Sequence, residues 1–398
     1  MGTTTLIGRA LALAAAMTGL PVDAQQADKE PPTIVVAAKL TADVTGVAAG
    51  GVARGARYLD NLDVVADADL ERMTGWRRSA AHVSLLNNFG GRPNDLAGSI
   101  QGIDNVEVAK TRLKLYEAWV EKGVGAYVTL RTGLYDVNSE FYQNDAAGLL
   151  ISPMFGVGSE LASTGVNGPA IFPSTALAMR FRAATPSVYA AVAIVNARAG
   201  TIGDEHGIDV SGRDGALLIG EVGWTGRGKL AIGAWHYTRE QPRIIPPGVT
   251  LADRRRYSEG VYLLAERGLI GVDDGGRGRY LAAFLRIGGS DGVTTPFGGG
   301  WQSGMMLKRP FAARPNGVLS LGIGSGLLSG NYRRSTPVDL PRAGPAETIV
   351  EATYRDDITA NVAIQPDIQY VIHPAANPLI RSALILGVRL TIRASNGR

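Results

Sequence analysis

The chain has 398 residues, of which 45% are hydrophobic, 19% are charged and 52 are glycine. It contains no cysteine, which excludes disulfide scaffolds, thiolate zinc sites and cysteine nucleophiles. The net charge of +4 is spread along the chain and is not concentrated in one segment, so the composition does not indicate nucleic-acid binding.

The first residues have the order of parts expected of a secretory signal peptide. Arg9 supplies a positive charge, Leu11–Leu20 form a short apolar core, and Val22-Asp23-Ala24 forms a small-residue cleavage site. We therefore expect residues 1–24 to be a signal peptide, with a short hydrophobic helix as the alternative, and residues 25–32 to be a polar lead-in. No later stretch of about 18 apolar residues occurs, so no membrane-spanning helix is predicted.

From residue 33 onward, apolar and polar residues alternate in segments of about ten residues. Because a strand repeats every two residues, each segment has one apolar and one polar face, and about ten residues are enough to cross a bilayer as a tilted strand. An even number of such strands is usual in bacterial barrels. Sixteen strands are predicted, near 33–48, 56–69, 79–88, 111–121, 124–135, 173–184, 187–197, 215–225, 229–240, 260–270, 277–289, 299–309, 317–329, 346–356, 361–372 and 380–392.

The predicted connections are of two kinds, which largely alternate along the chain, as in outer-membrane barrels. Short turns are expected at Lys122-Gly123, Thr185-Pro186, Thr225–Gly228, Asp357–Ala360 and His373–Pro378. Longer loops are expected at 89–110, 136–172, 199–214, 241–259 and 330–345. The predicted fold class is all-β: a transmembrane antiparallel β-barrel over residues 33–392, followed by a C-terminal tail at 393–398.

The loop 136–172 is too long for a passive connection and contains its own apolar run, Gly148–Phe155. A long loop with internal hydrophobic residues is usually packed against something or functional. In a barrel the space available to it is the interior, where it would narrow the pore. The alternative is an outer cap that packs on neighbouring loops.

Alternation assigns one row of each strand to lipid and the other row to the barrel interior. An arginine that faces lipid at mid-bilayer costs about 2–4 kcal/mol, so the charged rows are expected to face inward. In 111–121, however, Leu113 and Leu115 share a row with Glu117 and Trp119, which requires a bulge or a non-membrane portion, and both faces of 187–197 are apolar. The predicted inward residues are Arg131, Arg180, Arg182, Glu221, Trp235, Arg239, Glu266, Arg286, Glu351, Arg355, Asp367 and Arg389.

This inward set contains both signs of charge together with an aromatic residue. A ring of one sign selects ions of the other sign. A balanced set suits neutral, hydroxyl-rich solutes better, because arginines and carboxylates hydrogen-bond hydroxyls and aromatic faces pack on sugar rings. The alternative is that these charges only pair with one another and stiffen the wall.

Four motifs follow one another in the first half of the predicted barrel: RLKLYEAWVEKG at 112–123, LRTGLYDVNSEF at 130–141, AGLLISPMFGVG at 147–158 and TGVNGPAIFP at 164–173. They resemble the carbohydrate-selective porins of the OprB type, and the similarity extends over roughly residues 80–392. The resemblance implies an outer-membrane barrel of sixteen strands that passes glucose and related sugars by passive diffusion. It also implies that the constriction is lined by Arg131, Asp136, Asn138 and Glu140, together with Glu117.

The chain departs from the family pattern in two respects. Barrels of this kind usually end on an aromatic residue, whereas here the last predicted strand is followed by Arg393–Arg398. Aromatic residues make up only 7% of the chain, so the aromatic girdles at the membrane interfaces are sparse.

Signals for other functions are weak. Gly288-Gly-Ser290-Asp-Gly292 matches a nucleophile pattern, but no helix is predicted after it, and the four histidines lack metal-ligand spacing. We expect no enzyme, no cofactor and no metal. The rivals of a sugar porin are a general or anion-leaning diffusion porin, an outer-membrane lipid-modifying enzyme such as a lipase or deacylase, and a secreted lectin sandwich.

The predicted location is the cell outer membrane, which the chain would reach through the periplasm. The expected partners are carbohydrate solutes and outer-membrane lipid, without nucleic acid. The outward faces are compatible with either a monomer or a homotrimer.

Overall fold

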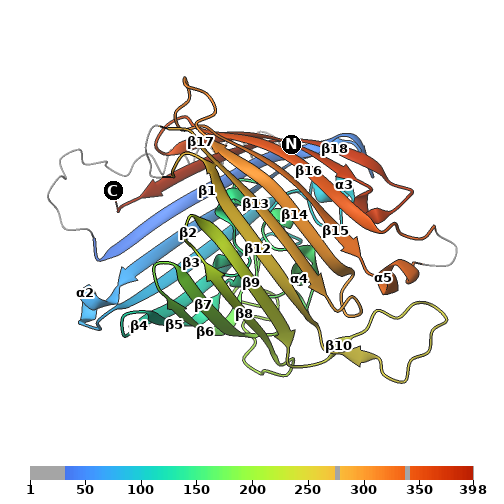
Figure 1. Cartoon of the computed structure of the whole chain (residues 1–398), viewed down its shortest axis with the longest axis horizontal. Coiled ribbons are helices and arrows are strands. Elements are labelled where there is room, and N and C mark those ends of the chain that lie inside the picture. Colours follow the sequence, from blue (N-terminus) through green and yellow to red (C-terminus); the bar gives the residue numbers. More distant parts are fainter. Residues whose placement is uncertain (1–31, 274–277, 337–340, 398) are drawn as a thin grey trace.

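The chain forms a closed antiparallel barrel of sixteen strands (Figure 1). The computed structural model describes residues 32–273, 278–336 and 341–397. The predicted fold class is therefore confirmed, and every predicted strand corresponds to one strand of the barrel. The expected signal peptide at 1–24 and nearly all of the lead-in at 25–32 lie outside the described residues.

The barrel strands lie in chain order around the wall, and the first strand pairs with the last. Their bounds are β1 (Ile34–Gly51), β2 (Gly55–Asp69), β3 (Ser79–Gly90), β4 (Leu113–Val124), β5 (Val128–Tyr135), β6 (Ala176–Ala184), β7 (Val188–Asn196), β8 (Ala216–Trp224), β9 (Gly228–Tyr237), β12 (Glu259–Ile270), β13 (Tyr280–Ser290), β14 (Phe297–Lys308), β15 (Val318–Leu328), β16 (Ala346–Asp357), β17 (Val362–Ile372) and β18 (Arg381–Ser395).

Short elements occupy the connections. The α-helices are α2 (Leu70–Thr74), α3 (Asn94–Ala97), α4 (Ser159–Ala162) and α5 (Gly330–Arg334). The 3₁₀ helices are η1 (Val137–Ser139), η2 (Asp145–Ala147), η3 (Pro153–Phe155) and η4 (Pro374–Ala376). A two-stranded hairpin of β10 (Gln241–Pro242) and β11 (Arg255–Arg256) projects from the barrel (Figure 1). Over the described part of the chain, no helix has both the length and the apolar character needed to cross a membrane.

The two ends of the barrel differ in the length of their connections. One end, here called the turn end, has tight turns such as 125–127, 185–187 and 225–227. The other, the loop end, has the connections 91–112 and 136–175, among others. Two predictions need correction. The turn expected at Lys122-Gly123 falls at 125–127, and His373–Pro378, expected among the short turns, lies at the loop end because it follows β17.

The barrel closes where β1 pairs with β18. Asp43 lies opposite Arg389 in this seam, and Ala37 lies opposite Ser395. The last strand therefore runs three residues beyond the predicted boundary at 392, and half of the expected tail at 393–398 belongs to the wall. Because both edges are paired, the barrel has no open strand edge in its wall.

The outward rows form an apolar belt. Leu386 and Val388 on β18 are 49% and 51% exposed. Arg389, the next residue, belongs to the opposite row, points inward and pairs with Asp43. Ile232 on β9 and Ile287 on β13 are also at least 50% exposed. A continuous apolar surface of this kind is suited to hydrocarbon, as the alternation predicts.

Both strands that fit the alternation poorly have a structural explanation. Ser84 on β3 lies opposite Glu117, but the next residue, Leu85, lies opposite Leu115, so β4 has one extra residue at Tyr116. This bulge changes the row that faces inward, as the prediction for 111–121 required. On β7, Tyr189, Ala191, Ala193 and Val195 face inward and are buried against other apolar side chains. Both faces of β7 are therefore apolar because protein, and not water, covers its inner face.

Candidate functional site

The connection between β5 and β6, residues 136–175, folds into the barrel; we call it the constriction loop. Its apolar side chains Phe141, Ala146, Leu150 and Phe155 are at most 3% exposed. Its helix α4 contacts β13 and β14, and in Figure 1 α4 lies within the outline of the barrel. The predicted position inside the barrel is confirmed, and the alternative of an outer cap is wrong.

Wall carboxylates hold this loop by its backbone. Glu221 on β8 accepts a hydrogen bond from the Tyr142 amide at 3.1 Å, and Glu266 on β12 accepts one from the Ala146 amide at 3.1 Å. Glu351 on β16 accepts bonds from two successive loop amides, including Ser152 at 2.9 Å. Hydrogen bonds to charged groups contribute about 1.5–3 kcal/mol each, so these contacts attach the loop to three separated strands.

An arginine of the wall also holds the loop, by donating hydrogen bonds to its oxygen atoms. Arg286 on β13 donates from Nη1 to the carbonyl oxygen of Phe155 at 2.6 Å and to that of Gly156 at 3.1 Å. Its Nε donates to Asn144 Oδ1 at 2.8 Å. The loop therefore presents amides to the wall carboxylates and carbonyls to a wall guanidinium, so that its buried backbone groups are satisfied.

This arrangement changes the interpretation of the predicted inward set. Glu221, Trp235, Arg286 and Glu351 face inward as predicted, but each is at most 3% exposed. Asp367 is also buried, and its Oδ2 accepts a bond from Gln369. The constriction loop bonds Glu221, Arg286 and Glu351 directly, so these three form its attachment. All five side chains are buried and do not border open water. These side chains therefore neither line a water-filled pore nor pair only with one another, which were the two expectations.

Inward glycines on the wall make room for the loop. A Cβ atom added at Gly322 on β15 would lie 2.6 Å from Leu150 Cδ1 and 2.7 Å from Phe155 Cζ. One added at Gly288 on β13 would lie 1.9 Å from Glu160 Oε1. Part of the high glycine content is therefore explained by the close approach of the loop to β13 and β15.

Replacing Gly322 by valine is expected to push the constriction loop off the wall toward the open interior and so to lower single-channel conductance. Overpacking of this kind costs about 1–3 kcal/mol. The matched control is Gly220→Val on β8, where an added Cβ meets only Ala191 O at 3.7 Å and the side chain would point outward. An unchanged conductance in Gly322→Val, measured in planar bilayers, would show that the loop position does not depend on this contact.

Four charged side chains form a compact group at the base of the loop; we call Arg131, Arg180, Glu121 and Glu140 the charged quartet. Arg180 Nε and Nη2 donate to the two oxygens of Glu140 at 2.6 and 2.9 Å, and Nη2 also contacts Glu121. Arg131 Nε donates to Glu121 Oε2 at 3.0 Å. Each guanidinium is thus matched by carboxylate, and the quartet has no net charge.

Part of the quartet meets the barrel interior. The side chains of Arg131, Glu121 and Glu140 are 15%, 25% and 16% exposed, whereas that of Arg180 is 1% exposed. The guanidinium of Arg131 lies 3.7 Å from the centre of the Trp119 ring, and His82 stacks on Trp119 at 4.9 Å. The bulge at Tyr116 is what turns Trp119 and Glu121 to this side. Hydrogen-bonding groups and an aromatic face therefore lie together.

Three residues expected to line the constriction form the root of the loop. Asp136 accepts hydrogen bonds from the Tyr116 hydroxyl at 2.7 Å and the Asn138 amide at 2.8 Å, and so caps η1. Glu117 accepts a bond from the Asp136 amide at 3.1 Å. Burial raises the pKa of the Asp136 carboxyl to about 7. Asp136, Asn138 and Glu117 thus set the direction in which the loop leaves β5.

A second connection, 91–112, also enters the barrel, which the sequence reasoning did not predict. Ser99 Oγ donates to Glu347 on β16 at 2.7 Å, and the Gln369 side chain donates to the Ile103 carbonyl at 2.9 Å. Asp104 is 2% exposed and lies 3.4 Å from Arg389. Burial, together with the Asp43 charge, raises the pKa of the Asp104 carboxyl to about 7.

The remaining predicted residues have separate positions. The guanidinium of Arg182 lies 4.4 Å from the Tyr189 ring centre on the inner wall, and Arg355 pairs with Asp357 at 2.9 Å near the turn end. The inward position predicted for Arg239 is wrong. β9 ends at Tyr237, so the predicted strand 229–240 was too long, and Arg239 is exposed in the bend beyond it. Glu121, Glu347 and Asp104 were missed. The alternation of β4 beyond its bulge could have identified Glu121, and that of β16 places Glu347 in the same row as Glu351, but no local pattern points to Asp104.

The possible nucleophile pattern has a structural role. Ser290 Oγ donates to the Phe297 carbonyl at 2.6 Å and ties the end of β13 to the start of β14. Since β13 is followed by a strand, the strand–turn–helix arrangement of a nucleophile elbow is not formed there. Within the described ranges, no group of three His, Asp or Glu side chains is placed to hold a metal ion.

A closed antiparallel barrel with an apolar outer belt and a loop folded into its interior has the architecture of a porin, a channel of outer membranes. A model of the carbohydrate-selective porin family OprB matches residues 53–393. The chain therefore belongs to the OprB family of carbohydrate-selective porins. The resemblance inferred from the motifs is confirmed, and the family and fold are those of a channel.

Individual relatives agree with this assignment. Porin B of Pseudomonas aeruginosa is 22% identical over 376 residues, which cover 84% of this chain and 81% of that protein. The high-pH structure of Pseudomonas putida OprB superposes with a TM-score of 0.80 at 18% identity, covering 91% of this chain and 94% of that one. An anion-selective porin from Comamonas acidovorans shares the fold with a TM-score of 0.51 at 14% identity, covering 91% and 99%.

Proposed function

We propose that neutral sugars cross this porin beside the constriction loop, and that they exchange hydrogen bonds with the exposed part of the charged quartet. The observation that supports this most is the neutral pairing of Arg131 with Glu121 beside the Trp119 ring. Hydroxyl groups of a sugar can accept from the guanidinium and donate to the carboxylates, while a ring face packs on the indole.

Passage is passive, and the contacts must be weak. A solute has to enter and leave the same site, so strong binding would slow transport. The quartet fits this requirement because its charges already pair with one another. A sugar hydroxyl that binds there gains only the small free-energy difference between a hydrogen bond to the quartet and one to water. The attachment of the loop to β8, β12, β13 and β16 keeps the opening at a constant size during passage.

The second candidate is an anion-leaning diffusion porin. Lys229 lies 3.6 Å from Glu221, and its side chain is 21% exposed in the interior. Together with Arg131 and Arg182 it gives some cationic surface. The paired state of Arg131 and Arg180 favours the sugar porin, because carboxylates beside the guanidinium groups oppose selection for anions.

Replacing Arg131 by alanine is expected to raise ionic conductance and to weaken the block of ion current by sugar, because the hydrogen-bonding guanidinium is lost. The measurement is current noise in planar bilayers with added glucose, with liposome swelling in a graded series of sugars as a second readout. Unchanged sugar block in Arg131→Ala would reject the role of this residue. Strong anion selectivity of the wild-type protein without sugar block would favour the second candidate.

The remaining proposals concern export and surroundings. Residues 1–24 are proposed to direct export through the periplasm and to be removed there. The apolar belt is proposed to contact outer-membrane lipid, with the barrel present as a monomer or a homotrimer. Mass measurement of the mature N-terminus and of the detergent-solubilised assembly distinguishes these possibilities.

A further inference from the structure

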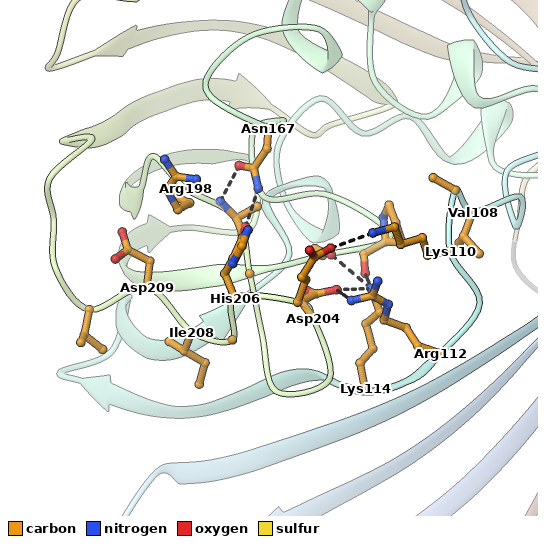
Figure 2. Close-up of a pocket in the computed structure, with 18 of the residues that line it drawn as sticks. Val108, Lys110, Arg112, Lys114, Asn167, Arg198, Asp204, His206, Ile208 and Asp209 are labelled. Atoms are coloured by element: carbon orange, nitrogen blue, oxygen red, sulfur yellow. Dashed lines mark hydrogen bonds and ion pairs between the residues drawn. The ribbon is translucent and has the colours of Figure 1, made fainter.

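A pocket of about 440 Å³ opens at the loop end, apart from the charged quartet. It is bounded by residues 108–114, 173–174 and 198–211, with Asn167 at its edge (Figure 2). We propose that this pocket is an outer docking subsite for a neutral mono- or disaccharide on its way to the constriction. The inference rests on the sugar transport proposed above. Ligand pockets commonly have volumes of 300–1,000 Å³, so the size is suitable.

The pocket exists because β5 is short. β5 pairs with β4 only between Ala118 and Val124, so the outer half of β4 lacks that neighbour. The connection 197–215 takes its place: the Leu115 amide donates to the Ile202 carbonyl at 2.9 Å, and Thr201 Oγ1 donates to the Leu115 carbonyl. The gap left by the constriction loop as it enters the barrel is thus filled by a different loop, and the pocket lies where these segments meet.

The floor of the pocket is fixed before any solute arrives. Lys114 is only 4% exposed, and its Nζ donates to Pro173 O at 2.7 Å, Ser174 Oγ at 3.2 Å and Asp204 Oδ1 at 3.0 Å. At the edge, the Asn167 side chain bonds both the amide and the carbonyl of Ala199, at 2.9 and 2.6 Å (Figure 2). A prearranged site loses less conformational entropy on binding.

Hydrogen-bonding groups remain available on the pocket walls. His206 is exposed and makes no hydrogen bond to another described residue. Arg198 donates from its backbone amide to Asn196 and from Nε to Asp214 Oδ2 at 2.7 Å. Its Nη donors therefore have no partner among the described residues. The side chain of Glu205 is 62% exposed at the same pocket and offers carboxylate acceptor oxygens. Donors and an acceptor around one space match a polyhydroxylated molecule.

The charges of the pocket indicate a neutral ligand. Lys110 pairs with Glu205 at 2.7 Å, and Asp204 lies between Lys114 and Arg112 at 3.0 and 3.6 Å (Figure 2). Carboxylates therefore accompany most of the cations, and an anion would meet repulsion as well as attraction. Apolar groups of Val108, Pro173 and Ile208 also line the space and can pack on the C–H face of a sugar ring.

The pocket lies at the outer end of the strands that bear the quartet. Lys114 and Glu121 belong to the inner side of β4, and at about 3.3 Å per residue they are separated by roughly 20 Å. Ser174, at the floor, directly precedes the strand that bears Arg180. A sugar that moves from the pocket along β4 would approach Trp119, whose ring packs on Arg131 of the quartet. The subsite thus increases the local supply of sugar to the constriction.

The test is side-specific sugar block of the full-length channel in a planar bilayer, with glucose, maltose and gluconate as probes. His206→Trp fills the pocket, and Arg198→Ala removes donors without filling it. The matched control is His236→Trp, which alters an exposed histidine near the loop end that pairs with Glu259 outside the pocket. Heat-dependent gel mobility verifies that each barrel is folded.

We expect both pocket variants to lower the association rate of glucose and maltose about three- to fivefold when sugar is added at the loop end, corresponding to loss of roughly one hydrogen bond. Sugar added at the turn end should block as in the wild type. Equal rates for the pocket variants and the control, or a selective loss of gluconate block only, would overturn the subsite while leaving sugar transport intact. Failure of the proposed function differs, because the wild-type channel would then show no sugar block from either side.

Discussion

Replacing Glu221 by alanine is expected to release the constriction loop and to raise single-channel conductance severalfold. Glu221 accepts bonds from the Tyr142 amide and from the hydroxyl of Tyr262 at 2.8 Å, and the Tyr189 hydroxyl bonds the same carboxylate. Without it, three buried donors lack an acceptor, at about 1–3 kcal/mol each. Planar-bilayer recordings measure the conductance, and sugar block should fall at the same time.

The matched control for this variant is Glu259→Ala. Glu259 is 53% exposed and pairs with His236 at 3.1 Å outside the interior, so its loss should leave conductance unchanged. Glu221→Gln retains one acceptor oxygen and should give an intermediate conductance. A Glu221→Ala channel that keeps wild-type conductance and sugar block, while folding normally, would mean that the loop is held without this carboxylate.

Replacing Arg180 by methionine is expected to make the channel cation-selective and to destabilise it. Arg180 connects Glu121 and Glu140 and also donates to Thr129 Oγ1 at 2.6 Å. Its removal leaves two carboxylates that only Arg131 can neutralise, and loss of one partner from a buried ion pair costs about 3–5 kcal/mol. The reversal potential in a salt gradient measures the selectivity, and denaturant unfolding in detergent measures the stability.

The control for the second variant is Arg267→Met on β12, an exposed arginine near the turn end. It removes the same charge from the chain without altering the quartet. Arg180→Lys keeps the charge but loses the two-pronged contact with Glu140, so it should preserve the reversal potential better than the stability. A reversal potential in Arg180→Met equal to that of Arg267→Met would show that the quartet does not control selectivity.

The inward side chains of the barrel fall into two classes: those that hold the constriction loop and those that border the path of the solute. Buried groups such as Arg286 and Glu351 satisfy the backbone of the constriction loop. Partly exposed groups such as Arg131 and Glu121 border the open interior. A change in the first class alters the shape of the opening, whereas a change in the second alters which solutes pass. Conductance and selectivity measured together separate the two effects.

The sequence by itself determined the number of strands, their order and the face that most of them present to lipid, with 187–197 unassigned. These follow from a two-residue period, which is a local property of the extended backbone. For β4 the sequence indicated a bulge or a non-membrane portion, because Leu113 and Glu117 could not share a lipid-facing row, and the structure has the bulge. The family motif also predicted that Arg131 and Glu140 lie at the same site, and the structure places both in the charged quartet.

Only the tertiary structure decided which inward side chains meet water. Glu351 and Arg286 have the same alternation as Arg131, yet the constriction loop covers them, through contacts about 200 and 130 residues apart in sequence. The entry of 91–112 and its bond to Glu347, 248 residues away, likewise leave no local trace. Strand faces depend on neighbouring residues, whereas loop burial depends on distant partners that meet only when the barrel closes.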